Sequence, residues 1–216
     1  MSKEYGYRLT SSTNWSSAKT EAENLGGHLV AINDAAEQQF LYNTFGGSPL
    51  STVVFVDANV ADYQTLVKGV KPGTKLIILD AIRDGIEQIT EVLVNQEKID
   101  SIHLVSHGSP GCLYLGNSQL SLNTLSRYQK DLASWFVAQG EPTPYLLLYG
   151  CNVATGDAGA EFIAKLQAST GAVVAASTTL TGNAGLGGNW QLEVNNGQEV
   201  SLAFDVATLA SNSVIS

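Results

Sequence analysis

Basic residues are scarce in this chain of 216 residues. It has 11 Lys and Arg against 20 Asp and Glu, which gives a formal net charge of −9. Nucleic acids and anionic membrane surfaces are bound through clustered basic side chains, and no such cluster is present. We therefore expect no nucleic acid and no anionic membrane as a partner, whereas basic peptides are compatible with this charge.

Long apolar runs are also missing. No uninterrupted apolar stretch approaches the roughly 18 residues that a membrane span requires, so we expect no membrane insertion. The segment Met1–Tyr5 lacks the charged and apolar regions of a signal peptide. We expect a cytoplasmic protein, one exported without an N-terminal signal, or a piece of a longer chain.

Cysteine occurs only twice, at Cys112 and Cys151. Two cysteines are too few for a disulfide framework, and a free cysteine is most often a small buried hydrophobe. Cys112 follows His107 closely enough to approach Cys151, so a disulfide or a redox lock on that thiol stays open. Zinc held by His107 and both cysteines is disfavoured, because no pair of them has a recognised metal spacing. We expect no metal and no cofactor.

The first 46 residues differ from the remainder and predict a small α+β segment. Apolar side chains recur there at helical spacing, at Trp15, Ala18, Ala22 and Leu25. The pair Gly26 and Gly27 ends this helix, a short strand over 28–32 follows, and a second helix begins at Asp34. Residues 47–51 contain Gly, Ser and Pro and are typical of a linker.

From residue 52 onward, strands alternate with helices. Strands are expected over 53–56, 75–79, 101–106, 145–149 and 172–176, with a hairpin at 112–115 and a late strand or hairpin at 190–194. Helices are expected over 60–69, from Asp84 through Leu93, over 122–138 and over 157–168.

This alternation predicts an α/β fold, a three-layer sandwich whose mostly parallel sheet is covered by helices on both faces. The domain is expected over 52–198, with a C-terminal extension over 199–216.

Reactive side chains follow several of these strands. Asp57, Asp80, His107 and Cys151 all stand at carboxyl ends, where open parallel sheets bind their ligands. Adjacent strands lie roughly 4.8 Å apart, so the side chains of His107 and Cys151 could meet. An imidazole beside a thiol favours the thiolate, which can attack an amide carbonyl. Backbone N–H groups of Gly108 and Cys151 are the expected oxyanion donors, and His107 would protonate the leaving amine.

Purely structural interpretations of these residues compete with the functional ones. His103 shares its strand with His107, and a histidine inside a strand is more often a satisfied core residue. Asp57 and Asp80 can equally cap helices or close turns.

Two resemblances bear on these patterns. The segment around Trp15, the sequence from Gly26 to Val30, and Glu37 with Phe40 resemble the opening of a C-type lectin-like domain over about 35 residues. The calcium- and sugar-binding part of such domains is absent, so carbohydrate binding is not carried over.

Residues from about 52 to 195 resemble a bacterial domain of unknown function (DUF4347), common in cyanobacteria and found in large surface or secreted proteins. The matching stretches are 106–108 with Gly111 and Leu113, 148–154, 171–178 and 187–190. The pairing of Ser106-His107-Gly108 with Gly150-Cys151, each after an apolar strand, is similar to the caspase-like fold of cysteine peptidases.

That likeness implies Cys151 as the nucleophile and His107 as the general acid and base. It also implies Asp57 as the reader of a basic side chain at the cleavage point. Ser177 and Thr178 would form the edge that pairs with the substrate backbone. The implied function is a cysteine endopeptidase or self-processing domain, acting on a peptide, a protein or its own parent chain. A non-catalytic adhesion or interaction module of a bacterial surface protein is the competing interpretation.

Overall fold

The computed structural model describes residues 15–28, 52–94, 96, 99–136, 143–197, 201–205 and 215. The chain divides into two compact units, residues 1–49 and 50–216. In the first unit, the predicted helix is found as α1 (Trp15–Asn24), and it ends where Gly26 adopts a φ of 77°. The strand expected at 28–32 and the helix expected from Asp34 lie outside the described residues, except for His28.

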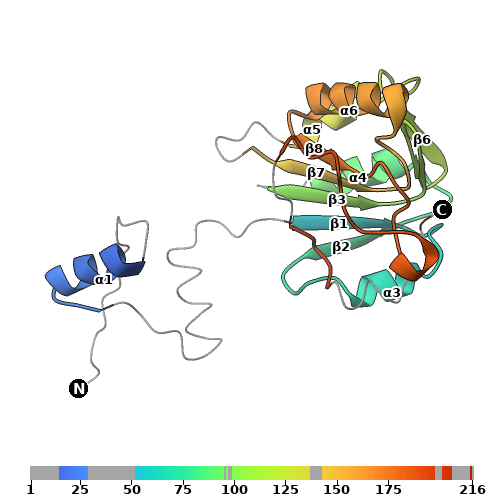
Figure 1. Cartoon of the computed structure of the whole chain (residues 1–216). Helices are drawn as coiled ribbons and strands as arrows, with labels where there is room; N and C mark the ends of the chain where they lie inside the picture. Colours follow the sequence, from blue (N-terminus) through green and yellow to red (C-terminus); the bar gives the residue numbers. More distant parts are fainter. Residues whose placement is uncertain are drawn as a thin grey trace. The chain divides into compact units, whose positions relative to one another are not determined.

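The second unit is built on a five-stranded parallel sheet in the order β2-β1-β3-β7-β8 (Figure 1). Its strands are β1 (Thr52–Asp57), β2 (Lys75–Leu79), β3 (Ser101–Val105), β7 (Tyr145–Tyr149) and β8 (Val173–Ala176). Both β1 and β7 are almost wholly buried, as apolar runs covered on two faces must be. The predicted α/β class and parallel sheet are confirmed.

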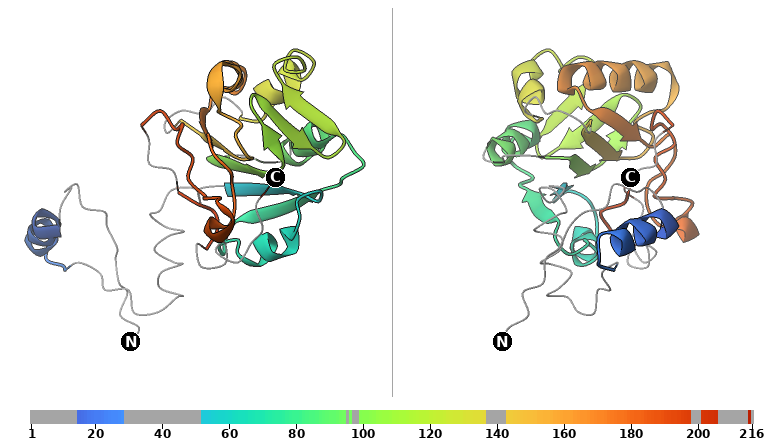
Figure 2. Two further views of the ribbon diagram at one scale, coloured as in Figure 1. Left: turned by 45° about the vertical axis from the view of Figure 1, so that its right-hand side comes forward. Right: turned by 90° about the vertical axis from the view of Figure 1, so that its left-hand side faces the viewer.

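Helices lie on both faces of this sheet and make the fold a three-layer sandwich (Figures 1 and 2). One face is covered by α4 (Gly85–Leu93), α5 (Gln129–Ser134) and α6 (Gly156–Thr170), and the other by α3 (Tyr63–Lys68). No helix within the described ranges has the length and apolar character that a membrane crossing demands.

Alternate residues of each strand divide between two hydrophobic cores. On β1, Val53 and Phe55 face the core of α4, α5 and α6, whereas Val54 and Val56 face the core that contains Leu66 of α3. The second core is completed by residues without regular secondary structure, among them Leu192, Ala203, Phe204 and Ile215. The late part of the chain therefore supplies much of one layer.

Three predicted elements differ from the structure. The helix expected over 60–69 is shorter, because the chain turns through Asp62 at a φ of 55° before α3 begins. In place of a helix from residue 122, turns precede α5, because the Thr124 hydroxyl bonds the Ser121 N–H at 2.9 Å and the Gln119 carbonyl at 2.8 Å.

The strand expected over 190–194 is reduced to one antiparallel bridge between Val194 and Ala176. The hairpin expected at 112–115 is part of a separate antiparallel sheet of β4 (Gly108–Ser109), β5 (Cys112–Leu115) and β6 (Ser118–Ser121).

His103 is a buried core residue, as the structural interpretation predicted. Its Nδ1 lies 3.2 Å from the Tyr149 hydroxyl, and the two rings stack with 5.8 Å between centroids. Burial, followed by the charge of Lys71, lowers the pKa of His103 to about 3, so the ring is neutral.

Candidate functional site

Strand register brings the His107 and Cys151 loops to the same edge of the sheet. Val105 of β3 pairs with Tyr149 of β7, and each reactive residue lies two positions beyond its member of that pair. The loops meet at Gly108, where an added Cβ would lie 3.0 Å from the Gly150 carbonyl carbon and 3.1 Å from the Cys151 nitrogen. Gly108 is needed for this close approach of two backbones.

The turn that carries Cys151 is held on two sides. Asn152 adopts a φ of 60°, and its N–H donates to the Thr179 carbonyl at 2.9 Å. The Ala154 N–H donates to Ser177 at 3.0 Å, and the Gly111 N–H donates to Val153 at 2.9 Å. The nucleophile candidate thus stands on a turn fixed by the end of β8 and by the β4–β5 loop.

The imidazole of His107 is oriented by a backbone carbonyl. Its Nε2 lies 3.0 Å from the oxygen of Asn59, which follows β1. A carbonyl only accepts, so Nε2 carries a proton, and in the neutral ring Nδ1 carries the lone pair. That Nδ1 is buried and has no hydrogen-bond partner among the described residues. The ring is therefore in the tautomer that can take a proton at Nδ1.

Asn59 was missed by sequence reasoning. It contributes its main-chain oxygen, and no side-chain pattern marks a main-chain group. Its position follows from Asp57, whose Oδ1 accepts the Asn59 N–H at 2.7 Å, while the Asn59 side chain donates to the Gly116 carbonyl at 3.2 Å.

Asp57 closes the turn after β1. The residue is 1% exposed, and its Oδ2 accepts the N–H of Gly116 in addition to the bond from Asn59. A substrate side chain would reach this carboxylate only after these bonds opened. The geometry therefore favours a structural role, in which Asp57 holds the turn whose Asn59 carbonyl orients His107. Asp80 likewise accepts a turn bond from the Ile82 N–H at 3.0 Å.

The thiol of Cys151 is covered. The residue is 3% exposed, its Sγ donates to the carbonyl of Ile215, and it accepts the Thr181 N–H at 3.2 Å. Burial raises the pKa of the Cys151 thiol, and the Thr181 N–H offsets part of that effect. No hydrogen bond joins the thiol to Nδ1 of His107 in this arrangement.

The edge predicted to receive a substrate backbone is already occupied. Ala176, which precedes Ser177 and Thr178, exchanges two backbone hydrogen bonds with Val194. Ser177 is fully buried and its hydroxyl bonds Thr179, whereas the Thr178 N–H donates to the Glu193 carboxylate at 2.8 Å. These bonds hold the turn behind Cys151. The backbone position beside the thiol is instead Thr181.

Both cysteines are free thiols. The thiol of Cys112 donates weakly to the Leu113 carbonyl at 3.7 Å, and burial raises its pKa. Across the described part of the chain, no group of three His, Cys, Asp or Glu side chains could hold a metal ion.

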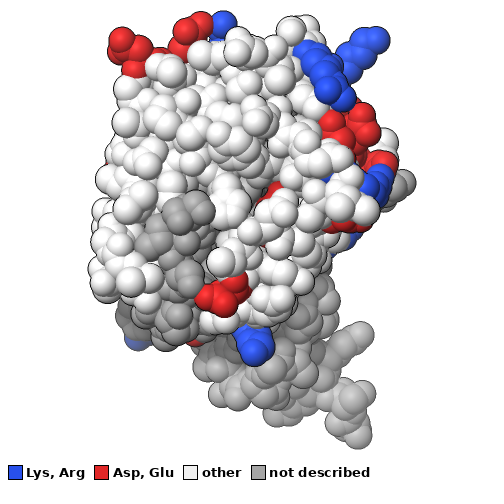
Figure 3. Space-filling view, turned by 90° about the vertical axis from the view of Figure 1, so that its right-hand side faces the viewer, with Lys and Arg blue, Asp and Glu red and all other residues white. Residues whose placement is uncertain are grey.

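Few charged side chains of the described residues show on the face at the carboxyl ends of the strands. Figure 3 views the molecule from the carboxyl ends of the strands, and most charged side chains on this face gather toward its margins.

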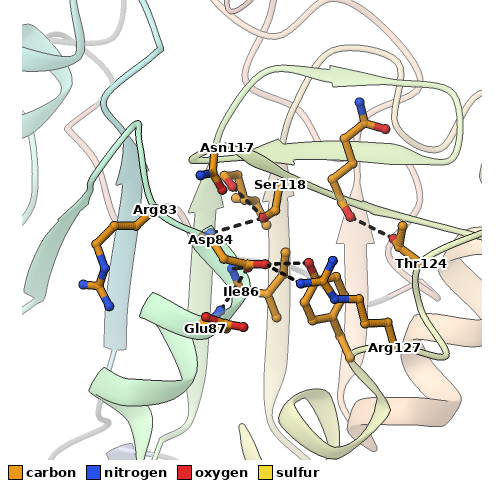
Figure 4. A network of polar contacts seen from close by, with 12 residues as sticks. Arg83, Asp84, Ile86, Glu87, Asn117, Ser118, Thr124 and Arg127 are labelled. Atoms are coloured by element: carbon orange, nitrogen blue, oxygen red, sulfur yellow. Dashed lines mark hydrogen bonds and ion pairs between the residues drawn. The ribbon is translucent and has the colours of Figure 1, made fainter.

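A second polar cluster lies at the start of α4 (Figure 4). Asp84 caps the helix through the N–H groups of Ile86 and Glu87, and it accepts the Tyr128 hydroxyl at 2.6 Å. Burial would raise the pKa of Asp84, but these hydrogen bonds outweigh it and hold that pKa below its usual value. The adjoining depression of about 480 Å³ is lined by residues of this cluster, in which Asp84 is bonded by Tyr128 and paired with Arg127. We assign it a structural role.

A family model described as "Domain of unknown function (DUF4347)" matches residues 53–214. No curated protein matches the chain. The matched region contains Asn59, His107, Cys151 and Thr181, and it ends one residue before Ile215.

Proposed function

The chain belongs to the DUF4347 family, and because that family's description assigns no activity, we propose from the site's chemistry that it is a cysteine peptidase. The proposed activity is that of an endopeptidase or a self-processing domain with a caspase-like arrangement of His107 and Cys151. The observation that carries the proposal is the hydrogen bond from His107 Nε2 to Asn59, which leaves a buried lone pair at Nδ1.

The proposed reaction uses the groups already described. Nδ1 of His107 takes the thiol proton, and the thiolate attacks the carbonyl carbon of a bound peptide. Negative charge develops on the carbonyl oxygen, where the N–H groups of Gly108 and Cys151 are the proposed donors. His107 then gives its proton to the leaving amine as the C–N bond breaks. Water hydrolyses the thioester, which restores the thiol and releases a carboxylate.

Specificity for basic residues would rest on Asp57. Its two backbone hydrogen bonds and its burial support a structural role more than a substrate contact. This specificity is tested with thiol-directed affinity labels that carry Arg, Lys, Asp or Asn before the electrophile. If Arg and Lys are not preferred, Asp57 has no part in the pocket.

One observation favours a non-catalytic module that keeps the fold as a scaffold for adhesion or interaction. The Cys151 thiol is buried and hydrogen-bonded, and its pKa is raised. Each of these properties slows nucleophilic attack. The lectin-like opening of the chain is compatible with the same interpretation.

A peptidyl acyloxymethyl ketone, which alkylates activated thiols, separates the two functions. We expect an adduct on Cys151 in the wild type and in the Cys112→Ala control. The adduct should be absent from Cys151→Ala and at least about tenfold slower to form in His107→Asn. Labelling that ignores the His107 substitution would support the scaffold.

A further inference from the structure

Ile215 lies in the candidate site in the manner of a bound peptide. Its N–H donates to the Thr181 carbonyl at 2.8 Å, and its own carbonyl accepts from the Cys151 thiol, 64 residues away in the sequence. The oxygen of this carbonyl group is thus already beside Sγ, although a thiolate would attack the adjoining carbon. Neither contact is local, so both reflect how the folded chain places this residue.

Thr181 is the residue that positions Ile215 against the thiol. Its N–H donates to the Cys151 sulfur at 3.2 Å, while its carbonyl accepts from Ile215. Pairing of this kind, main chain to main chain beside a sheet, is how extended peptides dock on a protein edge.

Two residues of the site also carry buried polar atoms that have no partner in the described part of the chain. Among the described residues, buried side-chain atoms without a partner are His107 Nδ1, Thr181 Oγ1 and Trp190 Nε1. Buried polar atoms are normally hydrogen-bonded, so such a group calls for a partner. Two of the three belong to residues of the Cys151 site, where a longer peptide would bring amide groups.

The side chain of Ile215 defines the subsite. It is 2% exposed and belongs to the buried cluster that includes Val56, Tyr149, Leu192 and Phe204. A branched aliphatic side chain is buried there by the hydrophobic effect, whereas a charged side chain would lose its hydration without gaining a partner. This subsite is distinct from the Asp57 carboxylate, which is closed by its backbone bonds.

We infer that Ile215 occupies the position before the scissile bond, so that the site accepts a branched aliphatic residue there and the chain's own Ile215–Ser216 bond is its first substrate. The inference rests on the proposed peptidase function and names its substrate.

The step balances without a cofactor. The Cys151 sulfur bonds to the Ile215 carbonyl carbon, the bond to the Ser216 nitrogen breaks, and that nitrogen takes the proton held by His107. Water then converts the thioester to the Ile215 carboxylate and the free thiol. Because the matched region ends at residue 214, this cut leaves the family domain whole.

Intact-mass analysis of the purified chain tests the cleavage. The wild type and Ile215→Val should lose whatever follows residue 215, whereas Cys151→Ala and Ile215→Arg should not. Ile215→Val keeps a branched apolar side chain, so it controls for a general disturbance of the core. Cleavage of Ile215→Arg at the wild-type rate would overturn the inference.

Affinity labels that carry Ile, Val, Arg or Asp before the electrophile test the specificity. They are applied to the Ile215→Asp variant, because we expect a charged side chain to leave the apolar subsite open. We expect the Ile and Val labels to react at least about tenfold faster than the charged ones. If labelling requires His107 and Cys151 but shows no such preference, or if the chain is not cut after residue 215, the inference fails and the proposed function stands. If no label reacts with Cys151 at all, both fail.

Discussion

At the scale of single residues, the two ring nitrogens of His107 differ: Nε2 bonds the Asn59 carbonyl, and Nδ1 has no partner among the described residues. Sequence patterns predicted His107 and Cys151, because each follows an apolar strand beside a glycine. They did not predict Asn59, whose main-chain oxygen fixes the tautomer, nor Ile215, which covers the thiol. Both act through backbone groups, which every residue has, and so no residue type marked them.

Gly108 provides a residue-scale prediction. Alanine there would place a Cβ 2.6 Å from the Val153 side chain and about 3 Å from the Gly150–Cys151 peptide. We expect Gly108→Ala to lower the free energy of unfolding by about 1–3 kcal/mol, as overpacking does, and to abolish labelling of Cys151. Chemical denaturation and mass spectrometry measure the two effects.

Gly185→Ala is the control, because its Cβ would meet only the tip of the Asn183 side chain at 3.1 Å. If the two variants show equal unfolding free energies and equal labelling of Cys151, Gly108 has no special role in the site.

His103 provides a second prediction at this scale. Its folded pKa of about 3 lies below the reference value of 6.5, so the unfolded chain binds the proton first as the pH falls. The free energy of unfolding should therefore decrease by about 1.4 kcal/mol per pH unit below pH 6.5, or by about 2 kcal/mol between pH 7 and 5.

The His103→Phe variant lacks this titration and should lose less stability over the same interval in denaturant titrations. Tyr149→Phe retains His103 and should keep the acid sensitivity of the wild type. An identical pH dependence for His103→Phe and the wild type would contradict the assignment.

At the scale of elements, the apolar runs and helical spacings predicted the strands and α4 well. The buried runs of β1, β3 and β7 needed no tertiary information, because a short apolar run between turn residues already indicates a buried strand. The helix expected from residue 122 was wrong because the Thr124 hydroxyl bonds backbone groups of Gln119 and Ser121. Apolar periodicity does not reveal such competition between a side-chain hydroxyl and the hydrogen bonds of a helix.

The start of α4 provides a prediction for an element. Asp84→Ala removes the cap and leaves the Tyr128 hydroxyl without its acceptor, so we expect a loss of about 1–2 kcal/mol in unfolding free energy. Because the folded pKa of Asp84 is lowered, its contribution is present above the usual carboxyl range and is lost as the pH falls through the folded pKa.

Glu91→Gln is the matched control, since Glu91 lies on the same helix and its exposed ion pair is with Arg83, which precedes the helix. Thermal or chemical unfolding of both variants at neutral pH makes the comparison, and an equal loss would contradict the role of the cap.

At the scale of the whole molecule, the site is assembled from five distant parts of the sequence. The turn after β1 supplies Asn59, the ends of β3 and β7 supply His107 and Cys151, and the late segments supply Thr181 and Ile215. Sequence reasoning placed the first three parts at one sheet edge, because parallel strands end together. It could not place Thr181 and Ile215, which lie outside the helices and strands, and of which Ile215 is held by packing in the second core.

The central claim is that His107 activates Cys151, and the chain contains an internal control for it. Cys112 and Cys151 are both buried, and burial raises the pKa of each. The decisive measurement is the alkylation rate of each thiol by iodoacetamide, followed by peptide mass spectrometry in the wild type and in His107→Asn. We predict that the substitution slows Cys151 at least about tenfold and leaves Cys112 unchanged. Equal rates at Cys151 in the two proteins would contradict the account.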